Sequence, residues 1–121
     1  MIGQRDFGIS DLIEEFKDLS SIKEAAKRIA TSVDLKLPLL ILGRGFSQPN
    51  AMELALKLQE TCKVPIQNFS IADYLHGPIS SLTADTQVII MRPINSKDKI
   101  FEDVKLRILE KTKRIYEIGA S

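Results

Sequence analysis

Short apolar runs alternate with longer segments of helical periodicity through most of this 121-residue chain. Two of these runs, 39–42 and 87–91, are almost wholly apolar, which is typical of strands buried on both faces of a sheet. We expect them to be adjacent parallel strands together with 115–118, whereas 64–69 forms a short edge strand because Pro65 removes a hydrogen-bond donor. Strands that alternate with helices run parallel through right-handed crossovers. The alternation therefore predicts a three-layer α/β/α domain.

Three segments carry the helical pattern. The first thirty residues repeat apolar side chains at helical spacing, and Ser21 and Glu24 can form a capping box where a second helix begins. The next helices are predicted at 49–62 and 97–113, each between two predicted strands. We expect all three segments to pack their apolar faces against the sheet.

Composition excludes several classes of function. Seventeen basic and sixteen acidic residues leave a net charge of +1, so no overall field attracts nucleic acid or an anionic membrane. The longest apolar run, 37–42, is too short to span a bilayer, and no signal-peptide pattern opens the chain. One histidine and one cysteine argue against a structural zinc site, which needs four nitrogen or sulfur ligands. Cys62, alone on a helical apolar face, suits a reducing compartment, so we expect a cytoplasmic protein without a metal.

Ligands of parallel α/β sheets bind beyond the carboxyl ends of the strands. The first strong strand ends in the turn GRGFSQ, 43–48. Gly43 and Gly45 lack the third glycine of a dinucleotide fingerprint, and no Gly-Lys-Ser/Thr follows for a P-loop, so we expect no cofactor. Two interpretations stay open: a tight strand-to-helix turn, or a turn that binds a ligand with Arg44 and Ser47.

A narrow charged stripe runs along the predicted helix 49–62. Glu53, Lys57 and Glu60 share one face at about 100° per residue, among mostly apolar neighbours. Glu53 and Lys57 have the favoured i, i+4 order of an ion pair, so the stripe can be a surface salt-bridge row. Alternatively, its carboxylates lie in a cleft, where partial burial raises a pKa towards that of a useful base. We expect the stripe to face the cleft beyond Gly43–Gly45.

Two stretches of the chain match a known family. The stretch LGRGFSQPNAMELALKLQE, 42–60, resembles the L-G-R-G-x-x-Y-P-x-A-x-E-x-A-L-K-L-K-E motif of sugar isomerase (SIS) domains, specifically the second SIS domain of the glucosamine-6-phosphate synthases. The stretch ADYLHGPISSL, 72–82, resembles the G-E-L-K-H-G-P-x-x-x-I motif of the same domain. The resemblance runs from about residue 39 to the end of the sequence. It implies a flavodoxin-like fold and a sugar-phosphate ligand, fructose 6-phosphate or glucosamine 6-phosphate.

The resemblance implies a role for each matched residue. Glu60 matches the general base that moves a proton between C2 and C1 in ketose–aldose isomerisation, and a carboxylate suits that step. His76 matches a histidine that opens the sugar ring in the neighbouring subunit, since imidazole passes protons at neutral pH. A histidine that caps or packs at the turn before Gly77 is the alternative. Glu53 and Lys57 match residues that support the pocket.

Departures from the family pattern leave the reaction open. Leu75 and Gln59 each stand where the synthases have lysine, and Gln48 stands where they have tyrosine. The form SIADYLHGP, 70–78, looks more like two-SIS-domain proteins without a glutaminase domain. The resemblance thus implies an isomerase or aminotransferase domain, a glucosamine-6-phosphate deaminase, or a non-catalytic sugar-phosphate sensor. Retention of both matched catalytic residues favours an enzyme over a sensor.

The resemblance also implies an incomplete domain. Family members carry two SIS domains, and a serine/threonine-rich loop of the first cradles the phosphate, whereas no such loop follows a strand here. We expect an N-terminal helical segment, 1–34, and a SIS domain, 35–121, truncated after about four strands. A truncated sheet exposes an edge and apolar helix faces, so we expect a homodimer. We expect no catalytic activity from the chain alone, because its phosphate cradle is incomplete.

Overall fold

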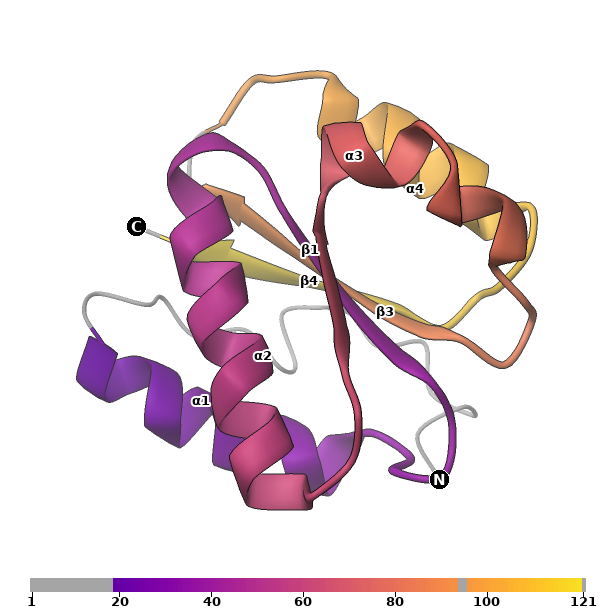
Figure 1. Cartoon of the computed structure of the whole chain (residues 1–121). Helices are drawn as coiled ribbons and strands as arrows, with labels where there is room; N and C mark the ends of the chain where they lie inside the picture. Colours follow the sequence, from indigo (N-terminus) through magenta and orange to yellow (C-terminus); the bar gives the residue numbers. More distant parts are fainter. Residues whose placement is uncertain (1–18, 94–95, 121) are drawn as a thin grey trace.

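A computed structural model describes residues 19–93 and 96–120, which form a parallel sheet between two helical layers (Figure 1). The strands are β1 (Leu39–Gly43), β2 (Gln67–Ser70), β3 (Gln87–Pro93) and β4 (Ile115–Ala120), in the order β2-β1-β3-β4. The helices are α1 (Leu19–Ser32), α2 (Gln48–Cys62), α3 (Ile71–Leu75) and α4 (Ile100–Leu109), with 3-10 turns η3 (Gly45–Ser47) and η4 (Pro78–Ser81). The predicted three-layer α/β/α architecture is confirmed.

Alternate side chains of the strands enter two separate cores. Ile41 and Ile89 pack with Leu54 of α2 in the layer formed by α1 and α2. Leu42 and Ile90 pack in the opposite layer, which α3, η4 and α4 cover. Because helices cover both faces, all five residues of β1 are buried, which explains its unbroken apolar run.

The strand predictions are confirmed in order and direction. β1 pairs with β3 and β3 with β4, while β2 lies at the edge beside β1, and all three pairings are parallel. β2 begins two residues after Pro65, whose missing N–H prevents an earlier start.

The last helix is shorter than the predicted 97–113. It begins at Ile100, whose N–H donates to Asp98 Oδ1 at 3.1 Å, so the preceding residues form a side-chain turn. After Leu109 the chain leaves the helix, because the Thr112 hydroxyl donates to the carbonyl oxygen of Thr86 at 2.9 Å and directs the chain into β4.

The N-terminal prediction is corrected at one point. α1 already includes Leu19, so the helix does not begin at Ser21 and the proposed capping box is not its start. Ala26 and Ile29 are fully buried against α2 and the sheet, and this burial holds the helix without a cap at Ser21. The rest of the predicted helical segment, 1–18, lies outside the described residues. The division at residue 34 stays a prediction.

The described residues contain neither a membrane-spanning helix nor a cluster of metal ligands. None of their helices is long and apolar enough to cross a membrane. Within the same part of the chain, no group of three or more histidine, cysteine or acidic side chains could hold a metal ion. Cys62 is partly buried at the end of α2, and burial raises the pKa of its thiol, so it is a poor nucleophile.

Candidate functional site

Two glycines shape the turn after β1. Gly43 lets α2 approach the strand closely, since a Cβ there would lie 2.7 Å from Gln48 Oε1 and 2.9 Å from Gln48 Cα. Gly45 has a φ of +60°, in the left-handed region that only glycine enters without strain. Both glycines are therefore required by the backbone path of the turn, whatever the turn binds.

Ser47 is fully buried and ties this turn to β3. Its hydroxyl accepts a hydrogen bond from the N–H of Arg44 at 2.9 Å and donates to the carbonyl oxygen of Met91 at 2.7 Å. Backbone groups thus engage the hydroxyl as donor and as acceptor. Ser47 stabilises the turn in this way, and its predicted contact with a ligand stays a prediction.

A cleft of about 520 Å³ opens between the turn after β1 and the loop after β3. Its lining residues are Arg44, Gly45, Phe46, Pro93, Ser96, Asp98 and Phe101. Arg44 Nε donates to Asp98 Oδ2 at 2.9 Å, and the two side chains are 39% and 44% exposed. The hydrogen bond from Arg44, with a second from the N–H of Ile100, lowers the pKa of Asp98. The cleft therefore holds one guanidinium and one carboxylate in contact and in reach of solvent.

Arg92 positions the loop after β3, which forms one wall of this cleft. One terminal nitrogen donates to Glu102 Oε2 at 2.6 Å and the other to the carbonyl oxygen of Ser96 at 3.2 Å. Its guanidinium carbon lies 5.4 Å from the centroid of the Phe101 ring, a cation–π contact. Since Ser96 and Phe101 both line the cleft, a single arginine behind the wall positions two of its residues.

The charged stripe of α2 does not reach the cleft. Lys57 Nζ lies 3.6 Å from Glu60 Oε1, and their side chains are 37% and 59% exposed. From Gln48, the first residue of α2, Glu60 lies about 18 Å further along the axis at 1.5 Å per residue. The prediction that the stripe faces the cleft beyond the glycine turn is wrong, because the helix runs away from that turn. The exposed Lys57–Glu60 pair agrees with the alternative of a surface salt-bridge row.

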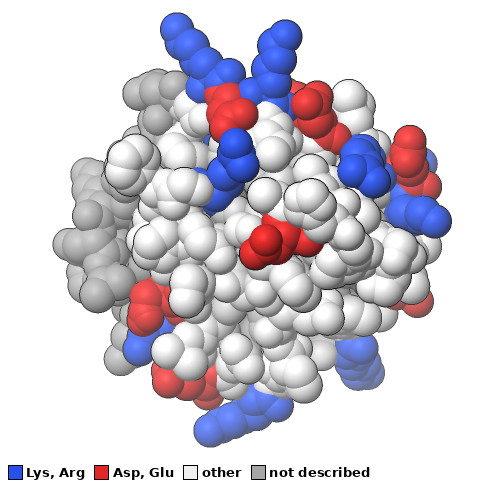
Figure 2. Space-filling view, turned by 45° about the horizontal axis from the view of Figure 1, so that its top comes forward, with Lys and Arg blue, Asp and Glu red and all other residues white. Residues whose placement is uncertain are grey.

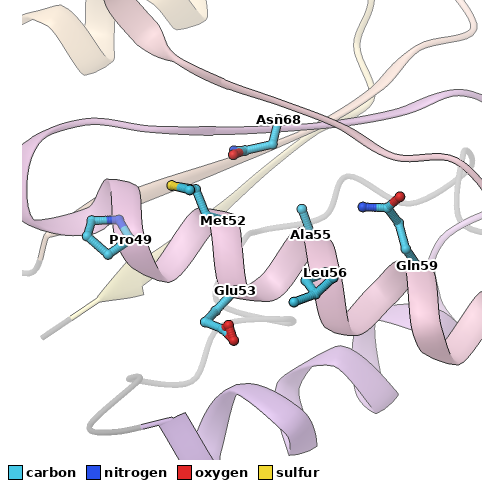
Figure 3. Close-up of a pocket in the computed structure, with 7 residues that line it drawn as sticks. All are labelled: Pro49, Met52, Glu53, Ala55, Leu56, Gln59 and Asn68. Carbon is cyan, nitrogen blue, oxygen red and sulfur yellow. The ribbon is translucent and has the colours of Figure 1, made fainter.

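Glu53 instead borders a second, largely apolar groove of about 470 Å³ between α2 and β2 (Figure 3). In Figure 3, Met52 of α2 and Asn68 of β2 point towards each other, whereas the carboxylate of Glu53 points away from β2. Met52 and Leu56 are 57% and 47% exposed. The outer surface of α2 thus combines exposed apolar side chains with the charged stripe.

His76 lies apart from both hollows. Its backbone N–H caps α3 by donating to the carbonyl oxygen of Asp73 at 3.2 Å. The residue is exposed, and its ring has no hydrogen bond or ion pair with another described side chain. Gly77 has a φ of 179°, which any residue adopts, so the turn does not require glycine there. The structure pairs Arg44 with Asp98 and Lys57 with Glu60, but it does not bring Glu60 and His76 into one pocket.

Phe46, Ser96 and Asp98 of the cleft were not predicted from the sequence. Phe46 is 94% exposed although it is a large apolar residue, and a lone aromatic inside a glycine turn was the available signal. Asp98 was assigned to the first turn of the predicted helix 97–113, whereas it lies in the loop before Ile100. A residue that caps a helix with one oxygen and pairs with arginine through the other is recognised only from the fold.

Charge is mixed on the face of the molecule shown in Figure 2. Basic and acidic side chains are interspersed around the rim, and most of the middle is uncharged. This face therefore carries no extended field of one sign of the kind that attracts a polyanion.

A parallel sheet covered on both faces, with a polar cleft beyond the carboxyl ends of β1 and β3, is the arrangement in which open α/β domains bind ligands. No family model matches the sequence. The chain is 32% identical over 82 residues to a glutamine–fructose-6-phosphate aminotransferase (isomerizing) of Buchnera aphidicola subsp. Baizongia pistaciae, which covers 68% of this chain and 13% of that protein. Its identity to the enzyme of the same name from Escherichia coli K12 is 30% over 103 residues, 85% of this chain and 16% of that protein.

The fold agrees with a solved structure of the same class. The C-terminal domain of glucosamine-fructose-6-phosphate aminotransferase from Francisella tularensis matches with a TM-score of 0.57 at 21% identity, over 94% of this chain and 29% of that chain. The chain belongs to the sugar isomerase (SIS) domain family, and its fold is that of the aminotransferase C-terminal domain. It spans 13% and 16% of the length of the two aminotransferases compared above.

Proposed function

We propose that this chain supplies one half of the active site of an amino-sugar-phosphate isomerase of the aminotransferase type, acting on fructose 6-phosphate and glucosamine 6-phosphate. The observation that carries the proposal is the outer surface of α2, where Glu53, Lys57 and Glu60 follow the family motif along a partly exposed stripe beside apolar side chains. A surface of this kind suits coverage by a second domain.

Glu60 is the proposed general base. Lys57 Nζ lies 3.6 Å from its carboxylate and orients it on the helix surface. Glu53, about one turn before Lys57, adds a second carboxylate to the same stripe. A covering SIS domain would exclude water from the stripe and bring further phosphate-binding groups. Exposure of Glu60 in the single chain fits a base that becomes enclosed only on assembly.

His76 is the proposed ring-opening residue, and it acts in the partner's site. Its ring is exposed at the end of α3 and makes no hydrogen bond with the described part of the chain, so it can extend into a neighbouring subunit. This placement supports a homodimer, which sedimentation of the purified chain would test directly. The turn residues Gly43, Arg44, Gly45 and Ser47 are proposed to contact sugar phosphate as well.

A chimera tests the role of Glu60. Residues 39–121 would replace the matched segment of the Escherichia coli aminotransferase, and conversion of fructose 6-phosphate would be followed. We expect Glu60→Gln to cut turnover by about 10²–10⁴-fold, the usual loss for a general base, with little change in KM. Glu110→Gln, which neutralises an exposed carboxylate at the end of α4, is the matched control and should leave turnover unchanged. Equal turnover of the two variants would remove Glu60 from the mechanism.

A non-catalytic sugar-phosphate sensor is the second candidate function. One observation favours it: neither Glu60 nor His76 lines the cleft that holds Arg44 and Asp98, so this cleft can bind a ligand without either proposed catalytic residue. The same chimera separates the two candidates, because a sensor domain would bind sugar phosphates in the folded chimera and support no turnover.

A further inference from the structure

We propose that the cleft between the turn after β1 and the loop after β3 is a separate binding site for a phosphorylated amino sugar, in which Asp98 recognises the ammonium group. This inference rests on the proposed binding of sugar phosphates by the chain. Glu60, the proposed general base, lies about 18 Å along α2 from Gln48 at the turn, and a six-carbon sugar phosphate is too short to contact both. The cleft therefore cannot serve the isomerisation site of its own chain.

The charges in the cleft select for a ligand that carries both signs. Arg44 attracts a phosphate, but Asp98, which is 2.9 Å from its Nε, repels the same group. A sugar phosphate with only hydroxyl groups thus gains an attraction and meets a repulsion of similar size. A ligand that carries a phosphate and an ammonium group can pair the phosphate with Arg44 and the ammonium group with Asp98. Each protein charge then exchanges its present partner for a ligand group, and no charge is left unpaired.

The other groups of the cleft suit the body of a sugar. The Ser96 hydroxyl accepts the N–H of Asp98 at 3.3 Å, and its own proton can be donated to a sugar hydroxyl. Phe46, 94% exposed at the rim, offers an aromatic face to the C–H groups of a sugar ring. Arg92 keeps the opposite wall in place through Ser96 and Phe101. The turn after β1 thus contributes a guanidinium and an aromatic ring to the cleft, and the loop after β3 contributes a carboxylate and a hydroxyl group.

A simple tether between the two loops is the competing explanation of the Arg44–Asp98 pair. Half-exposed ion pairs contribute little to stability, so a tether has small energetic value. The two explanations differ in what they predict for Asp98→Asn. Loss of a tether lowers stability and changes the affinity for all ligands by the same factor. Loss of an ammonium partner instead changes the ratio of the affinities for a ligand with an amino group and one without.

Glucosamine 6-phosphate and glucose 6-phosphate are matched probes, since they differ only in the amino or hydroxyl group at C2. NMR titration of the ¹⁵N-labelled 121-residue chain, at low ionic strength and about pH 6.5 where an amine is protonated, gives both dissociation constants. We expect both in the millimolar range, with the amino sugar bound about threefold more tightly. Asp98→Asn should bring this ratio to about one. Asp85→Asn, an exposed carboxylate at the opposite edge of the sheet, is the control and should keep the ratio.

Each result decides one part of the proposal. Equal affinity of the wild type for the two probes, or a preference that survives Asp98→Asn, overturns the assignment of Asp98 and leaves sugar-phosphate binding standing. If the chemical-shift changes occur at the Glu60 stripe and not at Arg44 and Ser96, the ligand binds elsewhere and the assignment of the site to the cleft is wrong. Binding of neither probe at millimolar concentration overturns the site together with sugar-phosphate binding by the turn, and the chimera still tests Glu60 on its own. Unfolding curves of both variants exclude loss of fold as the cause.

Discussion

Polar side chains serve opposite purposes at the two ends of the parallel strands, which we call the amino edge, where the strands begin, and the carboxyl edge, where they end. At the amino edge, Gln87 is fully buried, and its amide accepts from the N–H and donates to the carbonyl oxygen of Asp34, both at 2.8 Å. The buried hydroxyl of Thr112 likewise bonds backbone carbonyl oxygens of the loop before β3. At the carboxyl edge, Arg44 and Asp98 bond each other while both remain within reach of solvent.

This difference assigns stability to one edge and binding to the other. A buried side chain that bonds backbone groups cannot exchange its partner for a ligand, and its removal leaves those groups unpaired. A half-exposed ion pair opens at little cost, so a ligand can take the place of either partner. Ser47 is the exception at the carboxyl edge, because its buried hydroxyl positions the backbone of Arg44. The carboxyl edge therefore also contains one buried side chain whose role is structural.

Gln87→Leu should produce the largest loss of stability. The backbone N–H and carbonyl of Asp34 would both lose their partner, and we expect the free energy of unfolding to fall by about 2–4 kcal/mol. Urea denaturation followed by circular dichroism measures this change. Gln67→Leu, the same replacement at an exposed position of β2, is the control and should change stability by less than about 0.5 kcal/mol. Similar losses in the two variants would contradict the contrast between the edges.

Tyr116, the second residue of β4, gives a test by pH. Burial raises the pKa of its phenol to about 12, and Arg114 lowers it slightly, against an ordinary value near 10 in the unfolded chain. Since the folded pKa is the higher one, this stabilisation is complete below about pH 10 and is lost as pH rises towards 12. The expected loss is about 2–3 kcal/mol.

The measurement compares the wild type with Tyr116→Phe by urea unfolding from about pH 9 to about pH 12. The wild type should lose more stability over this interval than the variant, because the variant has no phenol to ionise at this position. Parallel losses in the two proteins would mean that Tyr116 titrates at an ordinary pKa and is not held neutral by the core.

Arg44→Gln should have the smallest effect on stability and still weaken the binding of sugar phosphates. Its urea midpoint should match that of Arg107→Gln, which neutralises an exposed arginine of α4 outside the cleft. Affinity for glucose 6-phosphate should fall about tenfold in Arg44→Gln, because a charge-assisted contact with the phosphate is lost. No loss of affinity, or a large loss of stability, would place Arg44 with the structural residues of the amino edge.

Much of the fold could be predicted from the sequence because it depends on local patterns. The apolar run of β1 marked a strand covered on both sides, and Pro65 marked β2 as a short edge strand. The end points of helices were less accurate, since Asp98 and Thr112 set the limits of α4 through hydrogen bonds to groups that only the fold brings near.

The candidate site was predicted only in part. The glycines of the turn and the residues of the α2 stripe were identified by motif, but their separation depends on the direction of α2 relative to the sheet. Periodicity states which residues share a helical face and does not state what that face meets. Asp98 and Phe46 entered the cleft because two loops from different strands converge at the carboxyl edge.

The sequence by itself determined the parallel α/β architecture and the resemblance to SIS domains, because each depends on residues that are neighbours along the chain. Only the tertiary structure decided which charges meet. It paired Arg44 with Asp98 across two loops and Arg92 of β3 with Glu102 of α4. The physical reason is that electrostatic partners are set by distance in space, and packing of the helices on the sheet fixes those distances.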